Sequence, residues 1–421
     1  MYPRCGVVHM TKMQTHPHDF FSWAVLAPQR VAVTMADAGA QHAAGEVANG
    51  ARALAQWLTA QGLQAGEMFA VLLENRVEVL ELVLAARLAG LYAVVLSTHL
   101  SAAEVAYIVK DCRPRLVVGS NRTWPQLQQV TGLQEVVLWS VEDPGDNDTG
   151  APSMVSAIRE TVDAPLVDFS DRPLGCDLLY SSGTTGHPKG VLKPMMPARY
   201  RHEPVPEVQI AARHFHLDEQ TIYLSPAPLY HAAPLRYTLR VLDTGGQAVI
   251  MGRFDAQRAL ALIERYRVTH SQWVPAMFQR MLQLPEDGRR RHDLSSHRVA
   301  IHAAAPCPVP LKQAMLDWWG DILYEYYAGS EGCGTTLITS AQWRQRPGSV
   351  GRAISGHIHI LDDEGQELPA GEVGNIYFSG GGQFAYLNDE GKTRQAINDK
   401  GWATYGDVGH VDEAGYLYLS D

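Results

Sequence analysis

The stretch LLYSSGTTGHPKGVL, from Leu178 to Leu192, concentrates hydroxyl and glycine residues and carries one lysine. Small hydroxyl side chains and glycines allow backbone N–H groups to converge on one point, and Lys189 adds a positive charge beside them. The ligand that fits such a loop is a phosphate chain. A surface turn would explain the glycines and the proline, but not why every non-glycine residue from Ser181 to Thr185 carries a hydroxyl. We therefore predict a nucleotide site here.

The spacing within this stretch argues against an ordinary P-loop NTPase. The loop of those enzymes places four residues between its first glycine and a Gly-Lys-Ser/Thr triplet, and a helix follows. Here Gly183, Gly186 and Lys189 are followed by Gly190 and by the apolar pair Val191–Leu192, which is typical of a strand. The residues predicted to bind phosphate are Ser181, Ser182, Gly183, Thr184, Thr185, Gly186 and Lys189.

This stretch closely resembles the phosphate-binding loop of the adenylate-forming superfamily, which includes acyl-CoA synthetases, luciferases and the adenylation domains of peptide synthetases. Further motifs of that family follow in its order. The segment SPAPLYHAAPL, from Ser225 to Leu235, resembles the one whose histidine, here His231, lies between the nucleotide and the acyl pocket. Outside that context, a histidine after Tyr230 is more often a packing residue. The assignment of His231 therefore depends on the order of the motifs along the chain.

The segment AIHAAAPCP, from Ala300 to Pro308, resembles the small-residue turn on which the family places the adenine ring. Small side chains at Ala304 and Ala305 permit a flat base to approach the backbone. A run of alanines is otherwise close packing, so only its position between a strand and a helix favours the ligand. The resemblance assigns these two alanines and Pro306 to adenine.

The segment YEYYAGSEG, from Tyr324 to Gly332, resembles the family segment that ends in Thr-Glu, with Ser330 and Ala328 replacing the usual threonine and glycine. A hydroxyl beside a carboxylate suits a magnesium–phosphate assembly, because Mg²⁺ takes one or two protein carboxylates together with substrate phosphates and water. Glu331 is the predicted magnesium residue, and a surface salt bridge is the alternative. The other nucleotide contacts implied here are Tyr327 stacked on the adenine, Glu325 near the base or its ribose, Tyr326, and Ser330.

The segment GWATYGDVGHVDEAGYLYLSD, from Gly401 to Asp421, resembles the family's Thr-Gly-Asp segment, with Tyr405 replacing threonine. Asp407 is assigned to the ribose, because an ionised carboxylate that accepts both hydroxyls makes charge-assisted hydrogen bonds of about 1.5–3 kcal/mol each. A β-turn aspartate is the alternative. Because Tyr405 replaces the threonine, only the contacts around the ribose are expected to differ from the family pattern.

The resemblance covers nearly the whole chain, from Asp19 to Asp421, and implies an acyl-CoA synthetase. Such an AMP-forming acid–thiol ligase uses ATP to convert a carboxylic acid to an acyl-adenylate and then forms a thioester with coenzyme A. The predicted catalytic residues are Lys189, His231 and Glu331. A bulky apolar acid, such as a fatty, aromatic or steroid-like acid, is expected from small residues around the presumed pocket. The substrate residues predicted are His231, Ala232, Ala233, Ala303 and Gly329.

Two other functions remain open at this stage. One is an adenylation enzyme that loads a carrier protein. The other is a nucleotide- or acyl-adenylate-binding module without turnover, since the family's C-terminal domain, with its mobile loop and catalytic lysine, is expected to be absent. On that reading the 421-residue chain is an incomplete enzyme.

Alternating helix and strand patterns surround these motifs. Helices are predicted at Val77–Ala89 and Ser101–Cys112, and strands at Tyr92–Leu96 and Arg115–Val118, which indicates a parallel sheet covered by helices. A second alternation follows the loop, and after Pro347 short strands with turn signals indicate a small β-barrel. The predicted fold is α/β, with two mixed sheets layered with helices (αβαβα) plus the barrel. Its subdomains are residues 1–175, 176–346 and 347–421.

The composition of the chain argues against several classes of partner and site. The formal charge of −10 argues against a nucleic-acid partner. Five scattered cysteines without a Cys-x-x-Cys pair argue against a disulfide framework or a zinc site, which favours the reducing cytoplasm. The apolar segment Val79–Leu96 is interrupted by charges and predicts a buried helix and strand rather than a membrane span. The expected partners are a carboxylic acid, ATP and coenzyme A, with a homodimer left open.

Overall fold

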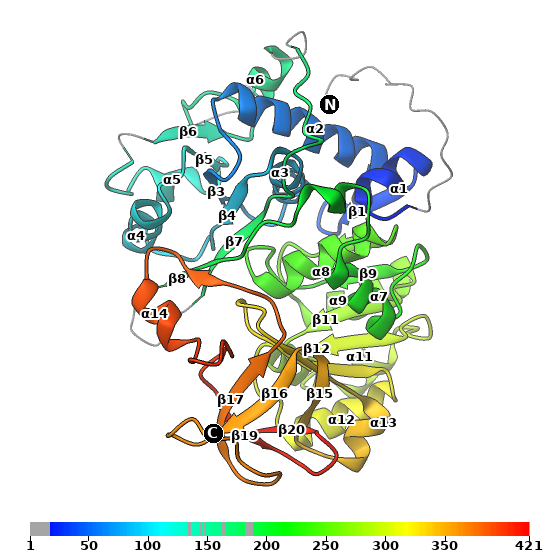
Figure 1. The fold of residues 1–421 in the computed structure, drawn as a ribbon. Coiled ribbons are helices and arrows are strands. Elements are labelled where there is room, and N and C mark those ends of the chain that lie inside the picture. Colours follow the sequence, from blue (N-terminus) through cyan, green and yellow to red (C-terminus); the bar gives the residue numbers. More distant parts are fainter. Residues whose placement is uncertain are drawn as a thin grey trace. The chain divides into compact units, whose positions relative to one another are not determined.

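The computed structural model describes residues 17–133, 136–143, 145–146, 149–160, 165–181 and 188–420. The chain forms two compact units, and Figure 1 labels many of their helices and strands. Unit 1 comprises Met1–Gly190, Pro194–Thr221 and Pro228–Gly252, and unit 2 comprises Val191–Lys193, Ile222–Ala227 and Arg253–Asp421. The division into three subdomains stays a prediction.

The centre of unit 1 is a parallel sheet with the strand order β7-β4-β3-β5-β6. Every residue of β4 and β5 is buried, as expected for parallel strands that are covered on both faces. Helix α3 is also buried along most of its length and packs against β4, and α2 packs against α3. These elements are α2 (Ala44–Ala60), β3 (Met68–Leu72), α3 (Val77–Ala89), β4 (Tyr92–Val95), α4 (Ala102–Cys112), β5 (Leu116–Gly119), α5 (Trp124–Leu127), β6 (Val137–Ser140), α6 (Met154–Glu160) and β7 (Cys176–Ser181).

The predicted alternation of this region is confirmed. The helix expected at Val77–Ala89 is α3, and the apolar segment Val79–Leu96 forms this helix and strand β4. Helix α4 begins with a capping box, in which Ser101 and Glu104 satisfy each other's backbone N–H groups. Among the described residues, no helix combines the length and apolar character needed to cross a bilayer.

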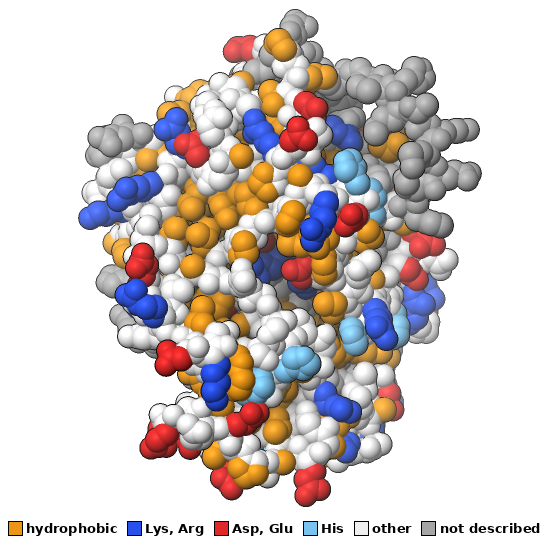
Figure 2. All heavy atoms as spheres, in the orientation of Figure 1, with side chains coloured by type: hydrophobic (Ala, Val, Ile, Leu, Met, Phe, Trp, Pro, Cys, Tyr) orange, Lys and Arg blue, Asp and Glu red, His pale blue; other side chains and the backbone are white. Residues whose placement is uncertain are grey.

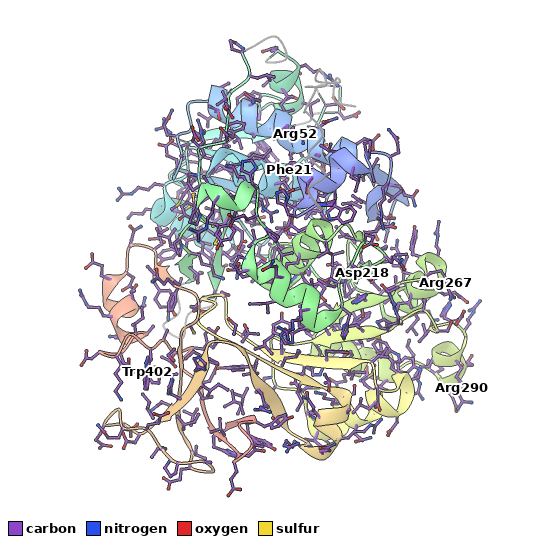
Figure 3. All side chains as sticks on the ribbon, turned by 45° about the vertical axis from the view of Figure 1, so that its right-hand side comes forward. Phe21, Arg52, Asp218, Arg267, Arg290 and Trp402 are labelled. Carbon is purple, nitrogen blue, oxygen red and sulfur yellow. The ribbon has the colours of Figure 1, made fainter. Side chains whose placement is uncertain are left out.

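A second group of elements in unit 1 surrounds β1, which pairs with β10 in parallel and with β2 in antiparallel orientation. Helix α1 packs against α2, where the Arg52 guanidinium lies 5.3 Å from the centre of the Phe21 ring (Figure 3). These elements are α1 (Phe20–Leu26), β1 (Val31–Met35), β2 (Ala40–Ala43), the 3₁₀ helix η1 (Ala198–Arg201), α7 (Pro206–Phe215), α8 (Ala232–Asp243) and β10 (Gln247–Ile250).

Unit 2 contains the parallel strands β9, β11, β12 and β13 in that order, followed by antiparallel β14 and β15. Helices α10 and α12 pack together, and Trp319 of α12 contacts the rings of Trp273 and Phe278 at 5.6 and 5.9 Å between centroids. These elements are β9 (Ile222–Ser225), α9 (Ala256–Tyr266), β11 (His270–Trp273), α10 (Pro275–Leu282), α11 (Glu286–Arg290), β12 (Val299–His302), α12 (Val309–Trp319), β13 (Leu323–Tyr327), β14 (Thr335–Thr339), α13 (Ser340–Gln345) and β15 (Ser349–Ser355).

The strands after Pro347 form an open antiparallel sheet, so the expected closed barrel is corrected. Their order is β16-β17-β19-β20-β15. The reason is β15, which pairs with β20 on one edge and with β14 on the other, so the segment extends the larger sheet. Gly351 makes this possible, because a Cβ there would lie 2.1 Å from the Leu337 carbonyl oxygen.

The sheet after Pro347 is also stabilised by side-chain stacking. The Trp402 ring stacks on His359 of β16 with 3.7 Å between centroids (Figure 3). The remaining elements of unit 2 are β16 (His357–Leu361), β17 (Gly374–Ser379), β18 (Ala385–Tyr386), α14 (Glu390–Gln395), β19 (Val408–Val411) and β20 (Leu417–Ser420), and β8 (Lys189–Leu192) crosses from unit 1 into unit 2.

Candidate functional site

The predicted phosphate loop connects two strands. Strand β7 ends at Ser181 and strand β8 begins at Lys189, so a strand follows the loop, as its spacing indicated. Ser181 therefore lies at the carboxyl end of a parallel strand, the position at which α/β sheets commonly bind ligands. Five of the predicted phosphate residues lie outside the described residues: Ser182, Gly183, Thr184, Thr185 and Gly186. Their role stays a prediction.

His231 is the N-cap residue of helix α8 and is exposed. Its ring lies 4.6 Å from the Tyr230 ring, and Tyr230 lies 6.2 Å from the ring of His99. Desolvation of the ring, and then repulsion from His99, lower the pKa of His231 below its usual value. The imidazole is therefore neutral at pH 7 and can accept or donate a hydrogen bond. Ala232 and Ala233 form the first turn of α8 and are partly buried.

The predicted adenine turn follows strand β12. Ala303 is 5% exposed, whereas Ala304, Ala305 and Pro306 are exposed. Ala304 adopts a left-handed conformation with φ of 72°, which is uncommon for a residue with a side chain and costs on the order of 1–3 kcal/mol. The turn therefore presents small exposed side chains and a strained backbone at the carboxyl end of a parallel strand, and its contact with adenine stays a prediction.

Glu325 of β13 is engaged in a buried charge cluster. Its carboxylate Oε2 lies 2.5 Å from Lys312 Nζ on α12 and 3.7 Å from His302 Nε2 on β12. Lys312 and His302 are fully buried and Glu325 is 6% exposed. Burial raises the pKa of Glu325 and lowers the pKa of Lys312, while their mutual attraction opposes both shifts. A contact of this carboxylate with the base or ribose, predicted from the sequence, would require the pair to open.

Tyr326 and Tyr327 point to different partners from the same strand. The Tyr326 hydroxyl accepts a hydrogen bond from Gln272 Nε2 at 2.9 Å, and Gln272 Oε1 accepts one from Tyr223 at 3.2 Å. The Tyr327 hydroxyl donates to Asp407 Oδ2 at 2.6 Å. The structure thus brings together the predicted adenine and ribose residues of β13 and of the turn before β19.

Tyr405 fixes the backbone under Tyr327. Its hydroxyl donates to the Gly334 carbonyl oxygen at 2.7 Å and accepts from the Gly334 N–H at 3.1 Å, while its ring lies 5.6 Å from the Tyr327 ring. A Cβ at Gly329 would lie 2.4 Å from the Tyr405 ring, so glycine is required there. Tyr405, the replacement for the family's threonine, therefore acts in packing. Gly329 contributes close packing rather than open space to any substrate pocket.

Glu331 receives a hydrogen bond from a residue that the sequence analysis missed. The Tyr386 hydroxyl donates to Glu331 Oε1 at 2.9 Å, across 55 residues of sequence. Lys193 lies near the same segment, since a Cβ at Gly332 would be 2.8 Å from its Nζ. The preceding Ser330 is partly buried. No sequence signal distinguishes Tyr386 or Lys193 from other residues of their types.

This arrangement fits magnesium bound through a substrate. Among the described residues, no group of three or more His, Cys, Asp or Glu side chains could hold a metal ion. Magnesium binding at Glu331 stays a prediction, in which phosphate oxygens and water complete the coordination, as is usual for Mg²⁺ beside nucleotides. On the face drawn in Figure 2, described acidic and basic side chains are interspersed rather than gathered into a basic surface.

Comparison with known proteins identifies the family of this chain. The model of the family described as AMP-binding enzyme matches residues 20–385. The long-chain-fatty-acid–CoA ligase FadD13 of Mycobacterium tuberculosis is 31% identical over 373 residues, which cover 86% of this chain and 70% of that protein. The 2-succinylbenzoate–CoA ligase of Geobacillus kaustophilus is 28% identical over 412 residues, covering 97% of this chain and 78% of that protein.

A solved structure shows the same fold. The N-terminal domain of FACL13 from Mycobacterium tuberculosis has a TM-score of 0.80 and 25% sequence identity, and the match covers 96% of this chain and 100% of that domain. The two mixed sheets with their helices therefore form the architecture of an adenylate-forming N-terminal domain.

Proposed function

The chain belongs to the AMP-binding enzyme family, and on that premise we propose that it is an acid–CoA ligase. It would use ATP to convert a carboxylic acid to an acyl-adenylate and then transfer the acyl group to coenzyme A. The observation that carries this proposal is the cluster in unit 2, where Tyr327 contacts Asp407 at 2.6 Å beside the segment that bears Glu331. In this proposal Tyr327 supplies an aromatic ring, Asp407 the carboxylate that binds the ribose, and Glu331 the carboxylate that binds the metal.

The first step is attack of the substrate carboxylate on the α-phosphorus of ATP. A carboxylate oxygen forms the new bond, the bond to the β-phosphate oxygen breaks, and pyrophosphate leaves. In this proposal Lys189 and the hydroxyl-rich loop hold the phosphates, and Asp407 accepts the ribose hydroxyls. Magnesium at Glu331 would supply positive charge to the phosphates. Fixed charges of this kind lower the barrier because they need no reorganisation when charge develops.

The second step is attack of the CoA sulfur on the adenylate carbonyl, with release of AMP. The bond between the acyl carbon and the AMP phosphate oxygen breaks as the thioester forms, and the thiol proton passes to water. His231 is proposed to contact the acyl group at this stage, because its lowered pKa keeps it neutral and able to hydrogen-bond. Ala304, Ala305 and Pro306 would hold the adenine through both steps, stacked against Tyr327.

The acid is proposed to be bulky and apolar. The support is the set of small residues Ala232, Ala233 and Ala303, while Gly329 is occupied by the packing of Tyr405. Relatives named for long-chain fatty acids, 4-coumarate and 2-succinylbenzoate have different acids but share an apolar part. The same names favour coenzyme A over a carrier protein as acceptor.

The experiment that tests this function is product identification. The full-length protein is incubated with ATP, Mg²⁺ and a panel of fatty, aromatic and steroid acids, with and without coenzyme A, and products are separated by mass spectrometry. We expect an acyl-adenylate without coenzyme A and an acyl-CoA with it. Adenylate formation without any acyl-CoA, but with transfer to a phosphopantetheinyl carrier protein, would favour the carrier-loading alternative.

A further inference from the structure

Several contacts attach Tyr386 to unit 2. Its backbone pairs with Val191 of β8, the strand that follows the predicted phosphate loop. Its N–H donates to Thr393 Oγ1 at 2.9 Å, and its hydroxyl donates to Glu331 Oε1 at 2.9 Å. One residue of the short strand β18 therefore connects the loop strand, helix α14 and the predicted metal carboxylate.

The position of the Tyr386 ring is fixed by its surroundings. The residue is 9% exposed, and its ring contacts Phe384 in an edge-to-face arrangement with 5.4 Å between centroids. Thr393 belongs to α14, and Asp389 caps that helix by accepting from the Lys392 N–H. The hydroxyl therefore has few alternative positions, and Glu331 Oε1 is held in one direction.

A tyrosine is suited to hold a carboxylate that must bind a cation. A phenol donates one hydrogen bond and carries no charge at neutral pH. Tyr386 can thus restrict the rotation of Glu331 while the carboxylate keeps its negative charge.

The same pairing occurs at the second assigned carboxylate. Tyr327 donates to Asp407 at 2.6 Å, so two of the three carboxylates assigned to the ligand accept a hydrogen bond from a tyrosine, whereas Glu325 is paired with Lys312. The two tyrosine–carboxylate pairs are linked through close packing, because a Cβ at Gly329 would meet both the Tyr405 ring at 2.4 Å and Glu331 Oε2 at 2.7 Å. The repeated arrangement points to orientation of carboxylates as the role of these hydroxyls.

We propose that Tyr386 is a positioning residue for the magnesium–phosphate assembly, which orients Glu331 and ties it to the strand that leaves the phosphate loop. This proposal rests on the function proposed above, since it needs Glu331 to face the metal. Partners that orient a metal ligand typically change metal affinity or activity by 10- to 100-fold when removed.

The test is Tyr386→Phe, which removes only the hydroxyl. ATP binding is measured by calorimetry with and without Mg²⁺, so the readout does not depend on turnover. We expect the gain in ATP affinity on adding Mg²⁺ to fall roughly 10-fold, with metal-free ATP affinity unchanged. Tyr377→Phe on β17 is the matched control, because it removes a tyrosine hydroxyl elsewhere in unit 2. A Tyr386→Phe protein that binds Mg²⁺ and ATP like the control would overturn the proposal.

A double-mutant cycle separates positioning from general destabilisation. In the Glu331→Gln background, Tyr386→Phe should have no further effect on the magnesium-dependent part of binding. Fully additive losses would show that Tyr386 acts independently of Glu331 and would also overturn the proposal. If the wild-type protein binds Mg²⁺ and ATP but no acid supports adenylate formation, the proposed function fails. The double-mutant cycle, which is measured by ATP binding alone, still decides the role of Tyr386.

Discussion

Replacing Lys312 by methionine should strongly destabilise the protein at alkaline pH. The methionine keeps the volume of the side chain but removes the charge that faces Glu325 at 2.5 Å. Both residues are buried, so the remaining carboxylate would be left without a cation in a site that water reaches poorly. Breaking a buried ion pair in this way typically costs about 3–5 kcal/mol of stability.

The loss should depend on pH in a defined direction. Without Lys312, the folded-state pKa of Glu325 rises further above its ordinary value of 4.5, because burial already raises it. A raised carboxyl pKa means that stability is fully present below the unfolded value and is lost as pH rises through the folded value. The penalty should therefore shrink by about 1.4 kcal/mol per pH unit on acidification, while Glu325 takes up a proton in the folded protein.

The assay is urea denaturation followed by tryptophan fluorescence at pH 5.5 and pH 8. The double variant Lys312→Met, Glu325→Leu should recover most of the lost stability, since replacing both partners of a buried pair by apolar residues is often neutral or stabilising. The exposed pair of Arg344 and Asp321, 2.8 Å apart, provides the control, and Arg344→Met should cost less than about 1 kcal/mol. Equal stability of Lys312→Met and wild type at pH 8, or a double variant as unstable as the single one, would refute this reasoning.

Three further predictions concern other sites. Glu81→Gln should stabilise the protein increasingly as pH rises above 4.5, because burial raises the pKa of the Glu81 carboxyl, which lies against Gly50. The same difference in melting temperature between variant and wild type at pH 5 and at pH 8 would contradict this. Thr184→Val with Thr185→Val should clearly weaken ATP binding in calorimetry, and unchanged affinity in a folded protein would remove the loop from the site. Asp407→Asn should weaken AMP binding by about 10- to 100-fold, the loss expected for hydrogen bonds to a charged group, whereas unchanged AMP affinity would reject the ribose assignment.

The sequence predicted the local elements of unit 1 well, and the reason is visible in α3 and β4. Their residues are almost all buried, so the apolar pattern and the αL glycine Gly90 at the end of the helix define both elements without knowledge of distant contacts. The barrel prediction failed for the opposite reason. Pairing of β15 with β20 joins Ser349 to Tyr418, a contact that no local pattern of short strands determines.

The sequence assigned residues to the ligand, and these assignments stay predictions, but it did not indicate the residues that hold them. Asp407 and Glu331 stand in recognisable motifs, whereas Tyr386 is 55 residues from Glu331 and lies in no pattern that sets it apart. Glu325 was assigned to the nucleotide, and its pairing with Lys312 depends on how α12 packs on β13. The charges and their spacing along the chain do not reveal which face of α12 packs on β13, so they could not predict this ion pair.

The claim that this protein forms an acyl-adenylate is tested most directly by acid-dependent exchange of labelled pyrophosphate into ATP. The exchange is measured for the full-length protein and for Glu331→Gln. Exchange requires that the acid attack the α-phosphate reversibly, so it reports adenylate formation itself. The account predicts exchange with at least one bulky apolar acid, and a loss of roughly 10²–10³-fold in Glu331→Gln, as for removal of one positioned electrostatic group. Absence of exchange with every acid while ATP still binds, or full exchange by Glu331→Gln, would contradict it.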